Sequence, residues 1–447
     1  MRTLALCFGV IAASVLALAS GAARAQHFDA HSFTLANGMS GVVLPNHRAP
    51  AVTQMVWYKI GAADDPFGKS GLSHFLEHLM FKGTRAVPPG AFSAKIAENG
   101  GRDNAFTTED YTAFHETVAR DRLGMVMGLE ADRMTGLALT DDVVLPERDV
   151  VLEERHMRID DDPAALLAEQ LRATLFLNDR YRIPTIGWEV EIRKLGTADA
   201  LAFYREWYAP NNAILVVAGD VEDAEVRSLA EQYFAPVARH PVPQRVRPIE
   251  PEHHAAARLE MKSPRAAQPS WRRLYVAPSY RTGDVQHAYP LQVLAEILGD
   301  GASSRLYRSL VLDRGLALSV EVSYEPSAIN LATFDIYATP KAGVAVPQLE
   351  AAIDAELRQI VEHGADADEV SRAEARMQAS SVYDRDSLTG PAEIIGAALA
   401  IGQSIDDVEA WPERIGQVTP DEVTAAARAV LIERNSATGI LLPEHTS

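Results

Sequence analysis

The residues of this chain that are most able to do chemistry lie in one short stretch, H-F-L-E-H at positions 74–78. Residues four apart lie on the same face of a helix, and the residue three positions along lies beside them. His74 and His78 can therefore hold one ion while Glu77 reaches its edge. Neutral imidazoles bind zinc, a catalytic zinc keeps one position for water, and a neighbouring carboxylate can take that water's proton. The spacing predicts a hydrolytic zinc site; the alternative is an amphipathic helix with two unrelated histidines.

Two histidines do not complete such a site, because a catalytic zinc usually has three protein ligands. A helix predicted over residues 146–154 carries Glu147, Val151 and Glu154 at i, i+4 and i+7, which places them on one face. Glu153 is rotated by about 100° from Glu154 and is expected to point elsewhere. The glutamates on this face are candidates for the third ligand, and the alternative is a solvated, glutamate-rich surface.

The elements that must position these residues are strands and helices in alternation. Residues 33–35 and 41–44 flank Asn37-Gly38, a dipeptide typical of a hairpin turn. Residues 52–58 predict a further strand, and the apolar run 213–219 predicts a buried one. The motif follows the third of these strands, so a sheet is expected to support it.

The chain repeats itself. Residues 192–219 and 415–442 each contain an apolar helix that begins with Thr-x-Asp, then a turn with an asparagine and an apolar strand. A proline-rich polar stretch between them predicts a linker. We expect an α+β fold of two homologous domains, each a mostly antiparallel β-sheet covered by helices. Because the alignment pairs Glu154 with Arg376, metal chemistry is expected in the first domain only. The expected division is a signal peptide at 1–25, a zinc-binding domain at 26–240, a linker at 241–252 and a metal-free domain at 253–447.

The N-terminus has the pattern of a secretory signal. Arg2 precedes an apolar run over residues 4–19, and Ala23-Arg24-Ala25 forms an A-x-A cleavage site before Gln26. We expect a mature chain that starts at Gln26 and is exported, with the periplasm as its location and secretion as the alternative. An uncleaved membrane anchor is the rival interpretation, although the apolar run is short for a membrane span.

Composition limits the partners. The formal net charge is −19, and the charged residues of the signal are both arginines, so the mature chain is more acidic still. An acidic surface argues against nucleic acid and anionic membranes as partners. We therefore expect no nucleic-acid binding and no stable membrane insertion after signal cleavage. Cys7, the only cysteine, lies in the signal, so the mature protein would have no disulfide.

Several blocks together resemble a known family. They are G-L-S-H-F-L-E-H-L-M-F-K-G-T at 71–84, Gly100-Gly101 with N-A-F-T at 104–107, the Glu147 to Glu154 helix and the repeated half. The chain resembles the pitrilysin/insulinase family of inverzincin zinc metallopeptidases over essentially its whole mature length. Its half-length size is similar to that of the mitochondrial processing peptidase β-subunit and its bacterial relatives.

The resemblance implies a role for each matching residue. One Zn²⁺ per chain would be bound by His74, His78 and Glu154. The implied catalytic residues are Glu77, as the general base that later serves the leaving amine, and Glu147, which would orient a ligand histidine. Asn104, Ala105 and Phe106 would form an edge strand to which the backbone of a peptide substrate adds.

The chain departs from the family pattern in residues 309–320. Family members commonly carry an Arg and a Tyr there, which reach over the scissile carbonyl, whereas this chain has Val311 and Leu318. Neither side chain can donate a hydrogen bond to a developing oxyanion. We expect a paralogous, zinc-less subunit to supply the Arg/Tyr pair in a heterodimer. The alternative is that Arg314 or another nearby residue substitutes and that the protein acts alone or as a homodimer.

The predicted function is therefore a zinc-dependent endopeptidase that hydrolyses unfolded peptides in an enclosed chamber, as the zinc-bearing subunit of that heterodimer. The alternative from another class is a non-catalytic assembly or interaction subunit that retains the zinc site.

Overall fold

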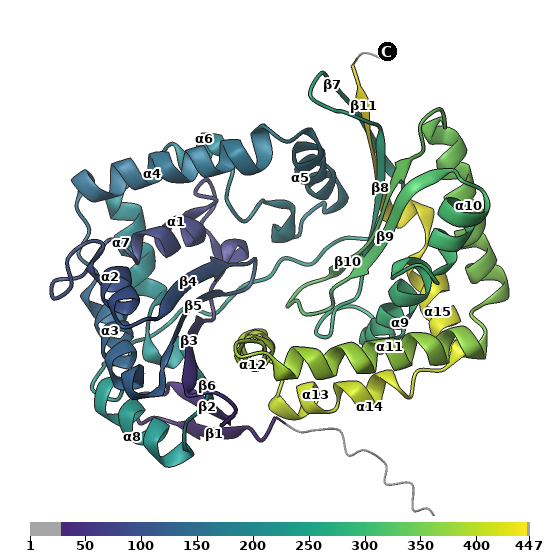
Figure 1. Ribbon diagram of the computed structural model, residues 1–447. Coiled ribbons are helices and arrows are strands. Elements are labelled where there is room, and N and C mark those ends of the chain that lie inside the picture. Colours follow the sequence, from purple (N-terminus) through teal and green to yellow (C-terminus); the bar gives the residue numbers. More distant parts are fainter. Residues whose placement is uncertain (1–27, 445–447) are drawn as a thin grey trace, which may run out of the picture.

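The computed structural model describes residues 28–444 and contains two β-sheets, each covered by helices (Figure 1). The predicted signal and its cleavage site lie outside the described residues. The strands of the first sheet are β1 (His31–Thr34), β2 (Ser40–Pro45), β3 (Ala51–Tyr58), β4 (Arg102–Thr107), β5 (Thr112–Ala119) and β6 (Ala213–Gly219). The helices of this half are α1 (Leu72–Leu79), α2 (Ala91–Glu98), α3 (Leu123–Gly136), α4 (Asp141–Arg155), α5 (Pro163–Leu175), α6 (Glu189–Ile192), α7 (Thr197–Trp207) and α8 (Asp223–Tyr233).

The second half repeats this composition. Its strands are β7 (Ala257–Ser263), β8 (Ser270–Ala277), β9 (Ala317–Tyr324), β10 (Ala332–Pro340) and β11 (Ser436–Pro443). Its helices are α9 (Ala288–Gly299), α10 (Val346–His363), α11 (Ala367–Asp386), α12 (Gly390–Ala400), α13 (Ile405–Glu409), α14 (Trp411–Ile415) and α15 (Pro420–Val430).

The two sheets have matching topology. The first has the strand order β1-β2-β6-β3-β5-β4, and the second has the order β7-β11-β8-β10-β9. In the described chain, parallel pairing occurs between β2 and β6 and between β7 and β11, and the other neighbours are antiparallel. The repeated sequence segments form α7 with β6 and α15 with β11, which are equivalent positions. The predicted α+β class with two homologous, mostly antiparallel domains is confirmed.

Strand β6 lies in the interior of its sheet because it is apolar along its whole length and every residue of it is buried. One face of the sheet is covered by helices of the first half. The other face packs against α12 of the second half, where Trp57 lies so close to Gly396 that a Cβ at Gly396 would come within 2.1 Å of the indole. The first sheet therefore completes its core with a helix from the other half, which fixes the two halves together.

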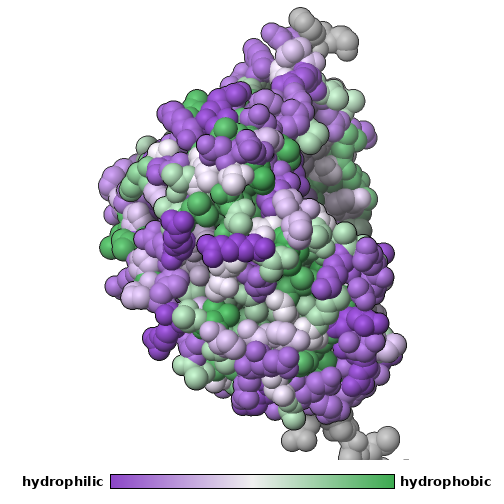
Figure 2. Space-filling model, turned by 90° about the vertical axis from the view of Figure 1, so that its left-hand side faces the viewer, coloured by the Kyte–Doolittle hydropathy of each residue, from purple (hydrophilic) through white to green (hydrophobic). Residues whose placement is uncertain are grey.

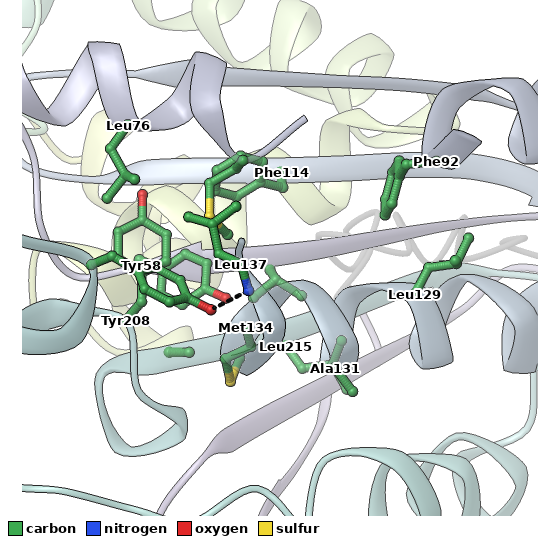
Figure 3. Packing of buried hydrophobic residues seen from close by; sticks show 14 of the residues in the cluster. Tyr58, Leu76, Phe92, Phe114, Leu129, Ala131, Met134, Leu137, Tyr208 and Leu215 are labelled. Atoms are coloured by element: carbon green, nitrogen blue, oxygen red, sulfur yellow. Dashed lines mark hydrogen bonds between the residues drawn. The ribbon is translucent and has the colours of Figure 1, made fainter. Parts of the chain in front are cut away.

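Helix α1 is held from two sides. At its N-terminus the Asp65 carboxylate accepts hydrogen bonds from the backbone N–H groups of Gly71, Leu72 and Ser73 at 2.8, 3.1 and 2.9 Å. These groups have no partner within the helix, so an acidic cap stabilises its first turn. On its apolar face, Leu76 packs against the core beside Tyr58 (Figure 3). The polar face of α1 is thereby presented in a fixed orientation.

The proline-rich stretch is fastened to the first half. Residues 238–254 form no helix or strand. Arg247 nevertheless pairs with Asp64 and Asp110, with Nη2 to carboxylate oxygen distances of 2.9 and 3.0 Å, and Arg245 Nε donates to Asp64 at 3.1 Å. These partly buried arginine–carboxylate contacts hold the segment in one path.

The face on the left of Figure 1 carries mostly hydrophilic residues interspersed with smaller hydrophobic groups (Figure 2). Within residues 28–444, no helix combines the length and the apolar character that crossing a bilayer requires.

Candidate metal centre

Helices α1 and α4 cross so that three potential ligand atoms meet. His78 Nε2 lies 3.1 Å from Glu154 Oε2, His74 Nε2 lies 3.7 Å from the same oxygen, and all three atoms are within 4.8 Å of one another. Two ligands at about 2.0–2.1 Å from a tetrahedral zinc lie about 3.3 Å apart. The observed spacing suits a single ion bound by these three side chains.

The hydrogen bonding of Glu154 supports this fit. Its Oε2 is buried and has no hydrogen-bond partner among the described residues, because the 3.1 Å contact with His78 lacks hydrogen-bond alignment. A buried carboxylate oxygen without a partner is costly. A cation between this oxygen and the two imidazoles would remove that cost, so the residues present fit a zinc ion.

Glu147 orients one of the histidines. His78 Nδ1 donates to Glu147 Oε1 at 3.0 Å, which fixes the tautomer that leaves Nε2 free as a ligand. Lys82 Nζ contacts the other oxygen, Oε2, at 2.5 Å. Burial raises the pKa of Glu147, but the hydrogen bonds with His78 and Lys82 outweigh it and hold the pKa below its usual range. Glu147 is thus a carboxylate with both oxygens occupied.

Glu77 lies beside the two histidines and is buried, with 8% of its surface exposed. Thr107 Oγ1, at the end of β4, donates to Glu77 Oε2 at 2.6 Å. Burial raises the pKa of Glu77, and the Thr107 hydrogen bond opposes the rise without cancelling it. A carboxylate with a raised pKa is better suited to accept and return a proton near neutral pH.

The two histidines differ in protonation in the metal-free chain. Burial, together with the charge of His78, lowers the pKa of His74 to about 4. Burial also lowers the pKa of His78, but the hydrogen bond with Glu147 and the nearby charge of Glu154 more than compensate and raise it to about 9. His74 is therefore neutral at pH 7, and metal binding must release the proton of His78.

The predicted substrate-binding residues lie on β4, at the edge of the first sheet. Asn104, Ala105 and Phe106 pair with His115, Phe114 and Ala113 of β5, and the other side of β4 has no neighbouring strand in the described chain. The end of β4 contacts Glu77 through Thr107, so the structure places this open edge next to the metal centre.

The second half replaces the metal centre with ion pairs. Arg376 of α11, which aligns with Glu154, binds Glu296 of α9 with an Nε to Oε1 distance of 2.5 Å. Arg305 Nε likewise donates to Glu369 at 2.6 Å. Val311 is half-buried, and Leu318 on the edge strand β9 is 52% exposed. Neither offers a hydrogen-bond donor.

A second group with metal-binding residue types lies at His156, Asp160 and Glu189. Arg155 contacts Asp160 at 3.4 Å, and Arg193 Nε donates to Glu189 at 2.9 Å. Because arginines already neutralise both carboxylates, this group does not resemble a cation site.

Three residues at the metal centre were not anticipated from the sequence. Lys82 and Arg158 each follow a predicted ligand by four positions, a spacing that could have indicated contact. No local sequence pattern indicates the contact between Thr107 and Glu77, because the two residues come together only when β4 takes its place in the sheet. Glu153 points away as expected, with 69% of its side chain exposed.

Comparison with known families gives two matches. The model described as insulinase (peptidase family M16) matches residues 41–188, and the model described as the peptidase M16 inactive domain matches residues 194–377. An uncharacterised zinc protease of Streptomyces coelicolor is 32% identical over 415 residues, covering 90% of this chain and 87% of the relative. The zinc protease PqqE of Helicobacter pylori is 32% identical over 293 residues, or 64% of each chain.

Solved structures show the same fold. A protease from Helicobacter pylori superposes with a TM-score of 0.87 at 25% identity, covering 94% of this chain and 100% of that chain. The periplasmic protease PqqL from Escherichia coli gives a TM-score of 0.77 at 17% identity. The match covers 92% of this chain but 47% of PqqL.

Proposed function

The chain belongs to the M16 (insulinase) peptidase family, with the insulinase-type domain first and the inactive-type domain second, and we propose that it is a zinc-dependent endopeptidase. The observation that carries this proposal is the convergence of His74 Nε2, His78 Nε2 and Glu154 Oε2 beside the buried carboxyl group of Glu77. One zinc ion per chain is the cofactor that this donor set fits.

Each residue of the metal centre has its own role in peptide hydrolysis. When bound, zinc lowers the pKa of a water molecule and polarises the scissile carbonyl. Glu77 accepts a proton from the water as its oxygen bonds to the carbonyl carbon. The C–N bond then breaks and Glu77 returns the proton to the leaving amine, which yields a carboxylic acid and an amine. Transfer of the acid's proton to the amine then gives a carboxylate and an ammonium group. Glu147 holds the His78 ring, and the hydrogen bond from Thr107 favours the ionised form of Glu77.

Substrates are extended or unfolded peptides. The backbone of such a peptide adds to the open edge of β4 along Asn104, Ala105 and Phe106, because an edge strand offers unpaired N–H and C=O groups. A peptide in this position runs past Thr107 toward Glu77.

We further propose that the chain is the zinc-bearing subunit of a heterodimer that encloses a chamber. Val311 and Leu318 offer no oxyanion donor, and the chain corresponds to about half of a double-length protease of the same fold. A paralogous, zinc-less subunit with the Arg/Tyr pair would complete the site. The division at residues 241–252 and a periplasmic location after removal of residues 1–25 are parts of the same proposal. They are supported by the signal pattern and by the periplasmic relative of shared fold.

The competing function is a non-catalytic assembly subunit, which the missing donors at Val311 and Leu318 favour. The deciding experiment measures peptide hydrolysis by this chain alone and mixed with its zinc-less paralogue, beside a Glu77→Gln variant of equal zinc content. Hydrolysis that disappears in the variant supports the peptidase. The absence of hydrolysis in both preparations would refute the peptidase function, and full activity of the chain alone would refute the heterodimer.

A further inference from the structure

Arg158 is an exposed cation beside the metal centre. It lies on the π-helical turn over residues 156–160 that continues α4, one turn after Glu154. Its Nη1 contacts Glu154 Oε1 at 2.7 Å, whereas the other oxygen, Oε2, faces the two histidines. The side chain of Arg158 is 70% exposed. A guanidinium has five N–H donors, so one contact leaves the others free for a ligand.

The guanidinium of Arg158 is open to a ligand, because its side chain is mostly exposed although it contacts a residue of the metal centre. Lys82, the other cation of this site, is placed differently. It contacts Glu147 behind His78, on the Nδ1 side of the ring that faces away from the ligand atoms. Of the two cations, Arg158 is the more exposed.

Peptide hydrolysis creates negative charge at two stages. Attack of water places a charge on the carbonyl oxygen, and C–N cleavage leaves a carboxylate. A guanidinium stays charged at all relevant pH values and binds such oxygens through paired N–H donors. Donors aimed at a developing oxyanion typically contribute a factor of about 10²–10³ to the rate.

We propose that Arg158 is a catalytic residue of this site, whose free N–H groups bind the oxyanion of the scissile carbonyl and then the carboxylate of the product. One N–H stays on Glu154, which anchors the guanidinium. As water adds, the π electrons of the carbonyl move to its oxygen, which accepts hydrogen bonds from Arg158 while Glu77 takes the proton. The inference rests on the proposed peptidase function and names an element of that site.

The test compares Arg158→Met, which removes the charge and donors at similar length, with Arg158→Lys and with Arg193→Met. Arg193 is a matched control because it is also exposed and also pairs with a glutamate four residues away. The readouts are kcat and KM on a fluorogenic peptide, using the preparation in which the wild-type chain is active, and zinc affinity by chelator competition. We expect Arg158→Met to lower kcat about 100-fold, with KM and zinc affinity changed less than about threefold. Arg158→Lys should recover part of the loss, and Arg193→Met should behave as wild type.

A binding measurement tests the role of Arg158 without requiring catalysis. In the zinc-loaded Glu77→Gln background, a product peptide with a free C-terminal carboxylate is compared with the same peptide as its amide. Arg158→Met should reduce the preference for the acid about tenfold, the usual scale for losing one charged hydrogen-bond donor. An unchanged preference, or a kcat loss that follows zinc loss in parallel, would overturn the role of Arg158. A wild-type chain as inactive as Glu77→Gln would instead overturn the peptidase function.

Discussion

Replacing Thr107 with valine should move the acid limb of the activity profile to higher pH. Thr107 Oγ1 donates to Glu77 Oε2 at 2.6 Å and so favours the ionised carboxylate. Burial already raises the pKa of Glu77, and this hydrogen bond opposes the rise. Valine keeps the shape and the β-branched character suited to strand β4 but cannot donate. Without the donor, the pKa of Glu77 rises further, and a higher pH is needed to produce the base.

The size of the shift follows from the hydrogen bond. A hydrogen bond to a charged group contributes about 1.5–3 kcal/mol, and about 1.4 kcal/mol corresponds to one pKa unit. Glu77 keeps 8% of its surface exposed, so water replaces part of the lost interaction. We therefore expect the acid limb of kcat/KM to move up by about one pH unit, while the plateau at higher pH changes little because the base is fully ionised there.

The assay is kcat/KM as a function of pH for the wild type, Thr107→Val and Thr53→Val. Thr53 is a matched control, since it is buried in the same sheet and its hydroxyl pairs with Thr117 at 2.8 Å, away from the metal centre. A limb that stays in place in Thr107→Val would refute the assignment of Glu77 as the titrating base. An equal shift in Thr53→Val would show that the effect comes from the sheet and not from the hydrogen bond.

Three further variants test other contacts. Glu154→Gln should lose zinc in a metal analysis, whereas Glu153→Gln, whose side chain is exposed, should retain it. Lys82→Met should weaken zinc binding about tenfold in chelator competition, because Glu147 loses the partner that holds it against His78. Arg133→Met should cost about 3–5 kcal/mol of unfolding free energy in urea, because it leaves two fully buried glutamates without their cation.

The sequence was most informative where chemistry and helical periodicity coincide. His74, Glu77 and His78 are close in the chain, so their geometry follows from one helix. The choice of Glu154 over Glu153 follows from the same argument applied to α4, and the structure brings Glu154 to the histidines. The two-domain α+β architecture was predictable because the chain repeats the α7–β6 unit as α15–β11, which occupies the same place in each sheet.

The remaining contacts depend on tertiary structure and had no comparable signal. Thr107 meets Glu77 because β4 lies at the edge of the sheet beside α1, a fact set by strand order and not by local pattern. The proline-rich stretch predicts a spacer by composition, yet Arg245 and Arg247 fasten it to Asp64 and Asp110. Charged residues far apart in sequence form such pairs through the fold, which periodicity cannot reveal.

Equivalent helix crossings in the two halves carry different polar side chains. In the first half α1, which follows β3, meets α4, and in the second half α9, which follows the equivalent strand β8, meets α11. Polar side chains meet at both crossings. In the second half Glu296 of α9 and Arg376 of α11 form an ion pair, in which the two charges neutralise each other. The first half places Glu154 against two histidines and leaves a buried oxygen without a partner. In the second half an arginine of the chain neutralises the glutamate at this crossing. In the first half the corresponding partner of the glutamate would be a bound metal ion. The metal centre therefore depends on the side chains at this crossing, because the backbone arrangement is common to both halves.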